Sequence, residues 1–279
     1  MVLRSLIAIW LIWGMNWVVM KTANTYFPPI TFVTYRFTLG ALIMIAIAFY
    51  HRHNAPKASL LPWIIITGVF QYAVTNITVQ VGMQTLSAGM ASVLNYTAPL
   101  WMTLMAKFFL EEQLTHRKMI GIFTSLVGLV VLTGVEPSEN FGAIFLVVIG
   151  AIAFAAAGII FKLKLSRENI SEIVAWQMGA GALSLIICNG VTDQGPVNWT
   201  FTAVLCLIYN GVLASALAFY LWNWLLRKLS ASVASTATLV VPIVGTIGGV
   251  IFLGESLTIV MVIGMIMILF GIFMVARKS

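Results

Sequence analysis

Residues 86–132 read LSAGMASVLNYTAPLWMTLMAKFFLEEQLTHRKMIGIFTSLVGLVVL, and residues 229–275 read LSASVASTATLVVPIVGTIGGVIFLGESLTIVMVIGMIMILFGIFMV. The two stretches align without a gap, at an offset of 143 residues. Proline, glutamate and glycine residues fall into register between them: Pro99 with Pro242, Glu112 with Glu255, Gly121 with Gly264 and Gly128 with Gly271. A shared apolar bias does not produce such a match, so the sequence contains an internal repeat, which sets the frame for every later motif.

The composition places this repeat in a membrane. Hydrophobic residues make up 61% of the 279 residues, only 8% are charged, and the mean hydropathy is +1.03. Soluble domains are near half apolar and about a quarter charged, so the solvent of this chain is lipid. A helix that crosses the bilayer needs about 20 apolar residues. The sequence therefore predicts an all-α membrane protein of ten transmembrane helices, at about 5–22, 30–50, 60–82, 87–109, 118–134, 142–162, 170–190, 200–224, 231–253 and 257–276.

Lysine and arginine are distributed unevenly among the predicted loops. One side receives the loop cations from Arg4 and Arg52 through to Arg277 and Lys278, whereas the other side has only Lys21. Cytoplasmic loops of membrane proteins carry an excess of lysine and arginine. We therefore expect a multi-pass protein of the plasma or inner membrane with both termini in the cytoplasm.

The number of spans in the repeat unit has a consequence for its orientation. Two five-span halves, residues 1–136 and 141–279, cannot both begin on the same side of the membrane, so we expect an inverted repeat. Residues 116–118 read HRK after span 4, and the equivalent residues 259–261 read IVM after span 9. Cations are thus present only where this position faces the cytoplasm. Inverted repeats are typical of alternating-access carriers, whose sites lie at the repeat interface near the midplane.

Pro99 and Pro242 both fall in the middle of a predicted span. Proline removes one backbone hydrogen bond and crowds the carbonyl four residues earlier, which here belongs to Asn95 and Thr238. A polar side chain beside a freed carbonyl at membrane depth favours a cavity wall, and the symmetric prolines favour a pair of hinges. The alternative is a static kink in which Asn95 binds a neighbouring helix.

Further polar residues are candidates for the wall of a substrate cavity. Tyr72, Asn76 and Gln80 lie at intervals of four on one face of span 3. The repeat places Phe219 and Asn223 of span 8 on the last two of these positions. Because polar side chains also hold transmembrane helices together, cavity wall and interhelical contact both remain open.

Span 1 carries Trp13 near the middle of the bilayer with Asn16 beside it, which predicts either an aromatic cavity wall or core packing. Arg36 is the one cation well inside a predicted span, and such a residue is a functional candidate. It lies only about six residues, or roughly 9 Å, from the outer loop, so its side chain can snorkel outward. This position favours a structural role, whereas an Arg36 that faces the cavity favours an anionic or zwitterionic substrate.

The missing residue types narrow the function. No acidic residue lies deep in a predicted span, and all three histidines fall in cytoplasmic loops. Intramembrane catalysis needs paired acids, histidines or a serine with a base, so we expect no enzyme, no cofactor and no metal site. The net charge of +7 is spread over short loops, which argues against a nucleic-acid partner, and the oligomeric state is not determined by the sequence.

The sequence resembles a known family of membrane proteins. WGMNWVVMK at 13–21, PPITFVTYRFTLGAL at 28–42 and the doubled LSA…P…FL pattern are similar to EamA-type transporters of the drug/metabolite transporter superfamily. The resemblance covers nearly the whole chain. It implies a ten-helix inverted-repeat carrier of a prokaryotic membrane, with spans 1–4 and 6–9 around a central cavity and spans 5 and 10 at the periphery. It also implies export of amino acids, related metabolites or drugs.

We therefore expect a secondary transporter that moves small metabolites by alternating access, as an exporter, with a small-molecule substrate and the lipid bilayer as its partners. A passive channel or facilitator on the same scaffold is the alternative. Saturable transport with counterflow supports the carrier, and a flux linear in concentration supports the channel. A membrane-embedded interaction protein without transport is a third hypothesis.

Overall fold

The computed structural model describes residues 1–51, 56–82, 84–86, 88–134, 140–192, 195–253 and 256–276. These residues form helices and short connections, with no strand among them. Eight helical stretches are long and apolar enough to cross a membrane: Val2–Met20, Pro29–Tyr50, Ala58–Gly82, Phe141–Leu165, Ile170–Val191, Phe201–Lys228, Ala231–Phe252 and Ile259–Ala276. The predicted all-α membrane class is confirmed at this level. The described residues do not include four charged residues named above: Arg52, Glu255, Arg277 and Lys278.

Several of these stretches are divided into consecutive helical segments. The α-helices are α1 Val2–Ala23, α2 Pro29–Tyr50, α3 Leu61–Gly68, α4 Thr75–Gly82, α5 Ala88–Asn95, α6 Ala98–Phe109, α7 His116–Thr133, α8 Phe141–Ile160, α9 Ile170–Val191, α10 Phe201–Ile208, α11 Ala218–Lys228, α12 Ala231–Ala237, α13 Val240–Leu253 and α14 Ile259–Ala276. A 3-10 turn precedes α3, η1 Ala58–Leu60. Three π-helical segments continue their neighbours without a break: η2 Val69–Val74, η3 Phe161–Leu165 and η4 Tyr209–Leu217.

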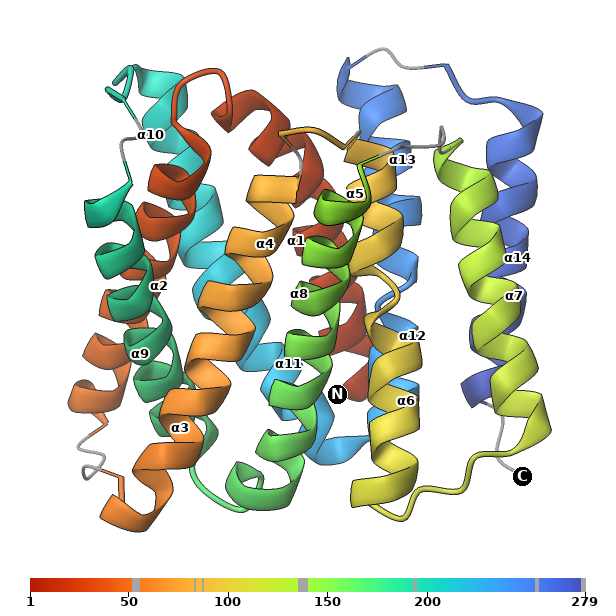
Figure 1. The fold of residues 1–279 in the computed structure, drawn as a ribbon, viewed down its shortest axis with the longest axis horizontal. Coiled ribbons are helices and arrows are strands. Elements are labelled where there is room, and N and C mark those ends of the chain that lie inside the picture. Colours follow the sequence, from red (N-terminus) through yellow and green to blue (C-terminus); the bar gives the residue numbers. More distant parts are fainter. Residues whose placement is uncertain are drawn as a thin grey trace.

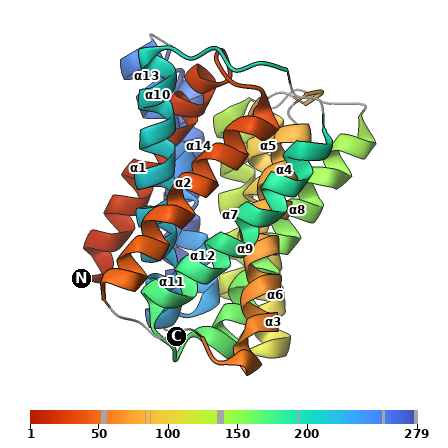
Figure 2. The same ribbon diagram turned by 90° about the vertical axis from the view of Figure 1, so that its left-hand side faces the viewer.

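Helices from the two halves of the chain pack against each other in matching pairs. Helix α2 lies along α9, and α7 lies along α14. In the same way α1 packs against α13, while α8, the equivalent of α1, packs against α6, the equivalent of α13. Figure 1 shows α7 and α14 together at the right-hand edge of the bundle, and Figure 2 shows α2 crossing near α9.

Glycines let α7 and α14 approach closely. A Cβ atom on Gly128 would lie 2.8 Å from the carbonyl oxygen of Gly264, and one on Gly264 would lie 2.7 Å from that of Gly128. The Ser125 hydroxyl donates a hydrogen bond of 3.1 Å to the Ile268 carbonyl across the same interface. Small residues at helix contacts are the usual means of close packing in lipid, where the hydrophobic effect does not drive helices together.

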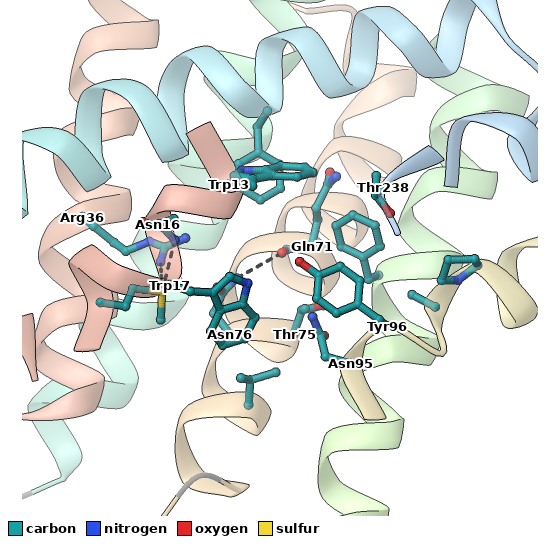
Figure 3. Close-up of a pocket in the computed structure, with 16 residues that line it drawn as sticks. Trp13, Asn16, Trp17, Arg36, Gln71, Thr75, Asn76, Asn95, Tyr96 and Thr238 are labelled. Carbon is teal, nitrogen blue, oxygen red and sulfur yellow. Dashed lines mark hydrogen bonds between the residues drawn. The ribbon is translucent and has the colours of Figure 1, made fainter. Parts of the chain in front are cut away.

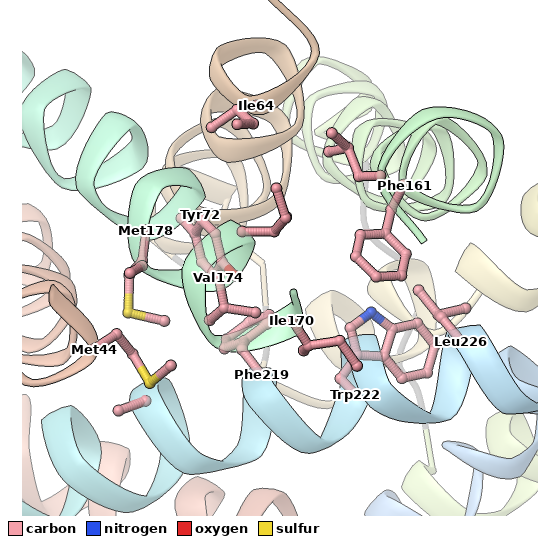
Figure 4. Packing of buried hydrophobic residues seen from close by; sticks show 14 of the residues in the cluster. Met44, Ile64, Tyr72, Phe161, Ile170, Val174, Met178, Phe219, Trp222 and Leu226 are labelled. Atoms are coloured by element: carbon pink, nitrogen blue, oxygen red, sulfur yellow. The ribbon is translucent and has the colours of Figure 1, made fainter. Parts of the chain in front are cut away.

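One end of the bundle carries most of the described cations, together with the start of α1 and the end of α14, at the bottom of Figure 1. We call it the basic end, after its loop and helix-end cations: Lys57, Arg117, Lys118, Lys162, Lys164, Arg167, Arg227 and Lys228. A large apolar core fills the bundle from this end to its middle. In Figure 4, Phe161, Trp222 and Leu226 pack together within it, and Tyr72 lies against Phe219.

Candidate functional site

The spans that contain the two symmetric prolines are both interrupted. Helix α5 ends at Asn95 and α6 begins with Pro99 in its first turn. Helix α12 ends just before Thr238, and α13 begins with Pro242 in its first turn. A proline has no N–H for the carbonyl four residues earlier, so the helical hydrogen-bond ladder cannot continue through either point. The mid-span interruptions expected from the sequence are present.

A pocket lies beside these interruptions, in the half of the bundle away from the basic end. It holds about 840 Å³ of empty space, counting its open mouth. Its walls come from α1, α2, the η2–α4 segment, the α5–α6 break, α8, α11 and the α12–α13 break, as Figure 3 shows. The lining residues are Trp13, Asn16, Trp17, Met20, Arg36, Gln71, Thr75, Asn76, Val79, Asn95, Tyr96, Ala98, Pro99, Phe154, Phe219 and Thr238. None of them belongs to α7 or α14. These two helices are spans 5 and 10, which the family resemblance placed at the periphery.

Aromatic side chains close the pocket toward the basic end. The ring of Trp13 lies 5.3 Å from that of Phe219 and 6.1 Å from that of Trp222. The Trp13 indole donates a 3.0 Å hydrogen bond to the Ala214 carbonyl. Such a donor needs a partner at membrane depth, and the bond fixes the ring on the side of the pocket that faces the basic end.

The polar stripe of span 3 is displaced from its expected register. Gln71 and Thr75 line the pocket together with Asn76, whereas Tyr72 is fully buried in the core and does not line it. The π-helical segment η2 explains the difference, because its wider turn rotates the following residues relative to an α-helix. Gln80 is buried as expected, but it is not a lining residue.

Side chains satisfy the backbone that this π-helical segment leaves open. The Asn76 amide donates to the carbonyls of Gln71 and Tyr72 at 3.3 and 3.0 Å. The Thr75 hydroxyl lies 2.8 Å from the Phe70 carbonyl and 3.0 Å from the Gly150 carbonyl. These bonds lock the irregular turn in place, and irregular backbone at membrane depth is tolerated where it borders a cavity.

Two further candidate positions stand behind the pocket wall. The Tyr72 ring packs 4.8 Å from that of Phe219, and Asn223 is the side chain that faces the Tyr72 hydroxyl. Asn223 is fully buried and is not a lining residue, nor is Pro242. The structure thus brings Trp13, Asn16, Asn76, Asn95, Phe219, Thr238, Pro99 and Arg36 to one pocket and leaves Tyr72, Asn223 and Pro242 out of it.

Several lining residues were not named as candidates from the sequence. Tyr96 follows Asn95 in the break of span 4, and its ring lies 6.4 Å from that of Trp17. Phe154 comes from the alanine-rich α8 and packs 5.4 Å from Trp222. The position of Tyr96 beside a proline-induced break is a signal that the sequence offered. The direction in which Phe154 points depends on tertiary packing.

Polar contacts join helix ends and loops at the basic end. The Glu112 carboxylate accepts hydrogen bonds from Ala231 N at 2.6 Å, Ser232 N at 3.3 Å and Ser232 Oγ at 2.7 Å, all at the start of α12. The Lys162 ammonium donates to the Leu226 and Leu229 carbonyls at 2.8 and 2.6 Å, at the end of α11. Each charge complements the adjacent helix terminus. We call this set of contacts the basic-end latch.

A bundle of membrane-length helices with a pocket that holds polar side chains beside interrupted helices is typical of a membrane transport protein. Comparison with known proteins agrees. The chain belongs to the EamA-like transporter family, whose model matches residues 3–134 and 141–277, and with it to the drug/metabolite transporter superfamily.

Curated relatives match over almost their full length. The chain is 32% identical to the protein named uncharacterized transporter YoaV of Bacillus subtilis, covering 98% of this chain and 96% of that protein. It is 26% identical to a probable amino-acid metabolite efflux pump of Salmonella typhimurium, covering 94% of this chain and 90% of the pump. A solved structure superposes with a TM-score of 0.84 at 17% identity, covering 98% of this chain and 95% of the other, and so shares the fold.

Proposed function

We propose that this transporter is a secondary carrier that exports small metabolites across the plasma or inner membrane by alternating access. The observation that carries the proposal is the pocket beside both broken spans, with the Trp13–Phe219 contact between it and the core of the basic end. Trp13, Asn16, Asn76, Asn95, Phe219 and Thr238 are the proposed substrate contacts, while Tyr72 and Asn223 support Phe219 from behind. The name of the Salmonella relative favours amino acids and related compounds as substrates and export as the direction.

The proposed scaffold is ten spans in two inverted repeats, residues 1–136 and 141–279, with both termini in the cytoplasm. The α5–α6 and α12–α13 breaks support it, because they fall at equivalent points of the two halves. The matching helix pairs, α1 with α13 and α8 with α6, support it as well. The start of α1 and the end of α14 lie at the basic end (Figure 1), and the positive-inside rule favours a cytoplasmic location for that end.

The breaks at Pro99 and Pro242 supply the proposed moving parts. Half-helices on either side of a break can tilt without rupturing a continuous hydrogen-bond ladder, since the proline already interrupts it. In the proposed mechanism, the basic-end latch and the Trp13–Phe219 contact close the cytoplasmic side in the conformation described. Tilting of α12 away from Glu112 would open that side while the outer half of the pocket closes. A channel needs a continuous path, and the Trp13–Phe219 contact across the bottom of the pocket favours a carrier instead.

The test is counterflow in liposomes that contain the purified full chain. Vesicles loaded with a metabolite mixture should accumulate a labelled component transiently, with a rate that saturates. Comparison of intracellular and medium metabolites with and without overexpression identifies the labelled compound to use and the direction. Flux that rises linearly with concentration and shows no counterflow indicates a facilitator, and vesicles that move no solute across the whole panel refute transport.

A further inference from the structure

Arg36 is buried in the wall of the pocket instead of reaching toward the membrane surface. Arg36 is only 4% exposed, and its guanidinium lies beside Asn16 in Figure 3. The Nη1 atom donates to the Met20 sulfur at 3.5 Å, and the Nε atom has no hydrogen-bond partner. A thioether is a weak acceptor. The five N–H donors of this arginine are therefore largely unused.

The charge of Arg36 also lacks a counter-ion among the residues that the structure describes. In the described part of the chain, Arg36 is the one charged residue among those that line the pocket. The sequence has no aspartate or glutamate before residue 111, and α1, α2, η2 and α4 all lie within that stretch. The nearest compensation is the ring of Phe37, whose centroid lies 4.5 Å from the guanidinium carbon. An unpaired buried charge is costly, so its retention at a pocket wall indicates that the partner comes with the ligand.

The surroundings of Arg36 indicate what that ligand carries. The side-chain oxygen of Asn16, which lies beside the guanidinium in Figure 3, is buried without a hydrogen-bond partner. The Gln71 amide nitrogen, in another part of the pocket wall, also has no partner. Away from Arg36 the pocket is lined by the rings of Trp17, Tyr96 and Phe154. One end of the pocket thus carries the cation, and the remainder combines aromatic rings with the polar side chains of Asn95 and Thr238.

We infer that Arg36 binds the carboxylate of the transported substrate, and that the carrier selects small monocarboxylates whose apolar part lies on the Trp17–Tyr96 side. A guanidinium binds a carboxylate through two parallel N–H···O bonds, which satisfies its donors and its charge together. This inference rests on the proposed carrier function. It assigns the specificity of the pocket to a single residue.

The repeat offers an internal comparison. The equivalent of Arg36 in the second half is Gln177, which is fully buried and does not line the pocket. Its amide donates a 2.6 Å hydrogen bond to the Thr67 hydroxyl. Gln177 therefore joins two helices, whereas Arg36 faces empty space. Replacing Gln177 should weaken the fold without changing ligand preference, which makes it the matched control.

The experiment measures ligand affinity of the full chain in nanodiscs by tryptophan fluorescence, since Trp13 and Trp17 line the pocket. The probes share a frame and differ in the head group: phenylalanine, 3-phenylpropionate, phenylalanine amide and phenethylamine, with the leucine-derived counterparts as a second frame. The wild type should bind carboxylates about 10- to 100-fold more tightly than the amide or amine. Arg36→Gln should abolish this preference, Arg36→Lys should retain part of it, and Gln177→Met should retain all of it.

Thermal stability separates a ligand-binding arginine from a structural one. Without ligand, Arg36→Met should melt at or above the wild-type temperature, because it removes an unpaired buried charge, whereas Gln177→Met should melt lower. Carboxylate should then stabilise the wild type and not Arg36→Met. A melting temperature of empty Arg36→Met as low as that of Gln177→Met overturns the inference.

Two other results overturn it: an amide or amine that binds the wild type as tightly as its carboxylate, or no carboxylate binding in either frame up to millimolar concentration. Counterflow distinguishes this failure from failure of the proposed function. Counterflow of solutes without a carboxylate preference leaves the carrier intact and refutes the role of Arg36. Carboxylate binding that depends on Arg36 but is not accompanied by counterflow refutes the carrier alone.

Discussion

Replacing Glu112 by glutamine should open the basic end of the transporter. In the conformation described, the carboxylate accepts three hydrogen bonds, of 2.6, 3.3 and 2.7 Å, from Ala231 and Ser232 at the first turn of α12. Glutamine has nearly the same size but carries no charge, and its amide nitrogen cannot accept a hydrogen bond. The variant therefore weakens the latch while leaving the surrounding packing in place.

The size of the effect follows from these contacts. Hydrogen bonds to a charged group contribute about 1.5–3 kcal/mol each, and the charge at a helix N-terminus contributes roughly 0.3–1 kcal/mol. Glu112 is only partly buried, and glutamine keeps one acceptor, so the net loss is smaller, about 1–2 kcal/mol. This corresponds to about a 5- to 30-fold increase in the ratio of open to closed conformations at this end.

The assay is cysteine labelling in inside-out vesicles. Ala234 lies in α12 just past the latch and is fully buried, so Ala234→Cys is placed in a background where Cys188 and Cys206 are replaced by alanine. A membrane-impermeant maleimide then reacts in proportion to the open population. The labelling rate should rise about 5- to 30-fold when Glu112→Gln is added.

Glu111 provides the matched control, because it lies in the same loop, is exposed and undergoes the same change of charge. Glu111→Gln should label at the parent rate. Equal labelling of the Glu112→Gln variant and its parent, or an equal increase for both glutamine variants, refutes the latch. Loss of the monodisperse peak in size-exclusion chromatography would identify a folding defect, and labelling is compared only among variants that keep it.

Three further outcomes are expected. Pro99→Ala restores an N–H toward the Asn95 carbonyl and favours a continuous span, so counterflow should slow several-fold while the melting temperature is maintained; an unchanged rate at normal expression argues against the hinge. Gly264→Leu places a side chain against the Gly128 carbonyl and should lower the free energy of unfolding by roughly 1–3 kcal/mol, read as a lower melting temperature with unchanged substrate affinity; a weakened affinity at a stable fold contradicts this. Lys162→Met leaves the carbonyls at the end of α11 without their charged donor and should raise labelling at the basic end, and a parent-like rate would limit the latch to Glu112.

Much of the candidate site could be predicted because it depends on covalent properties of single residues. Proline lacks an N–H wherever it stands, so Pro99 and Pro242 interrupt their spans as expected. The residues four positions earlier, Asn95 and Thr238, line the pocket as a direct consequence. Trp13 could be placed near the middle of its span in the same way. Which neighbours its ring meets could not.

The register of span 3 shows where sequence reasoning stops. Spacing by four placed Tyr72 and Asn76 on one face, but the π-helical segment at Val69–Val74 turns Gln71 and Thr75 into the pocket and Tyr72 into the core. Nothing in the local sequence marks this turn. The backbone carbonyls that this turn leaves without helical partners accept side-chain hydrogen bonds within span 3. The Thr75 hydroxyl also bonds the Gly150 carbonyl of α8, a helix that lies far away in the sequence.

The sequence by itself determined the membrane environment, the helical class, the internal repeat and the two interruptions. These depend on composition, on period and on the chemistry of proline. Only the tertiary structure decided that Arg36 turns into the pocket and that Glu112 meets the start of α12, 119 residues away along the chain. The physical reason is that a helix fixes the spacing of its side chains, whereas the direction they face and the partners they meet depend on the helices packed around it.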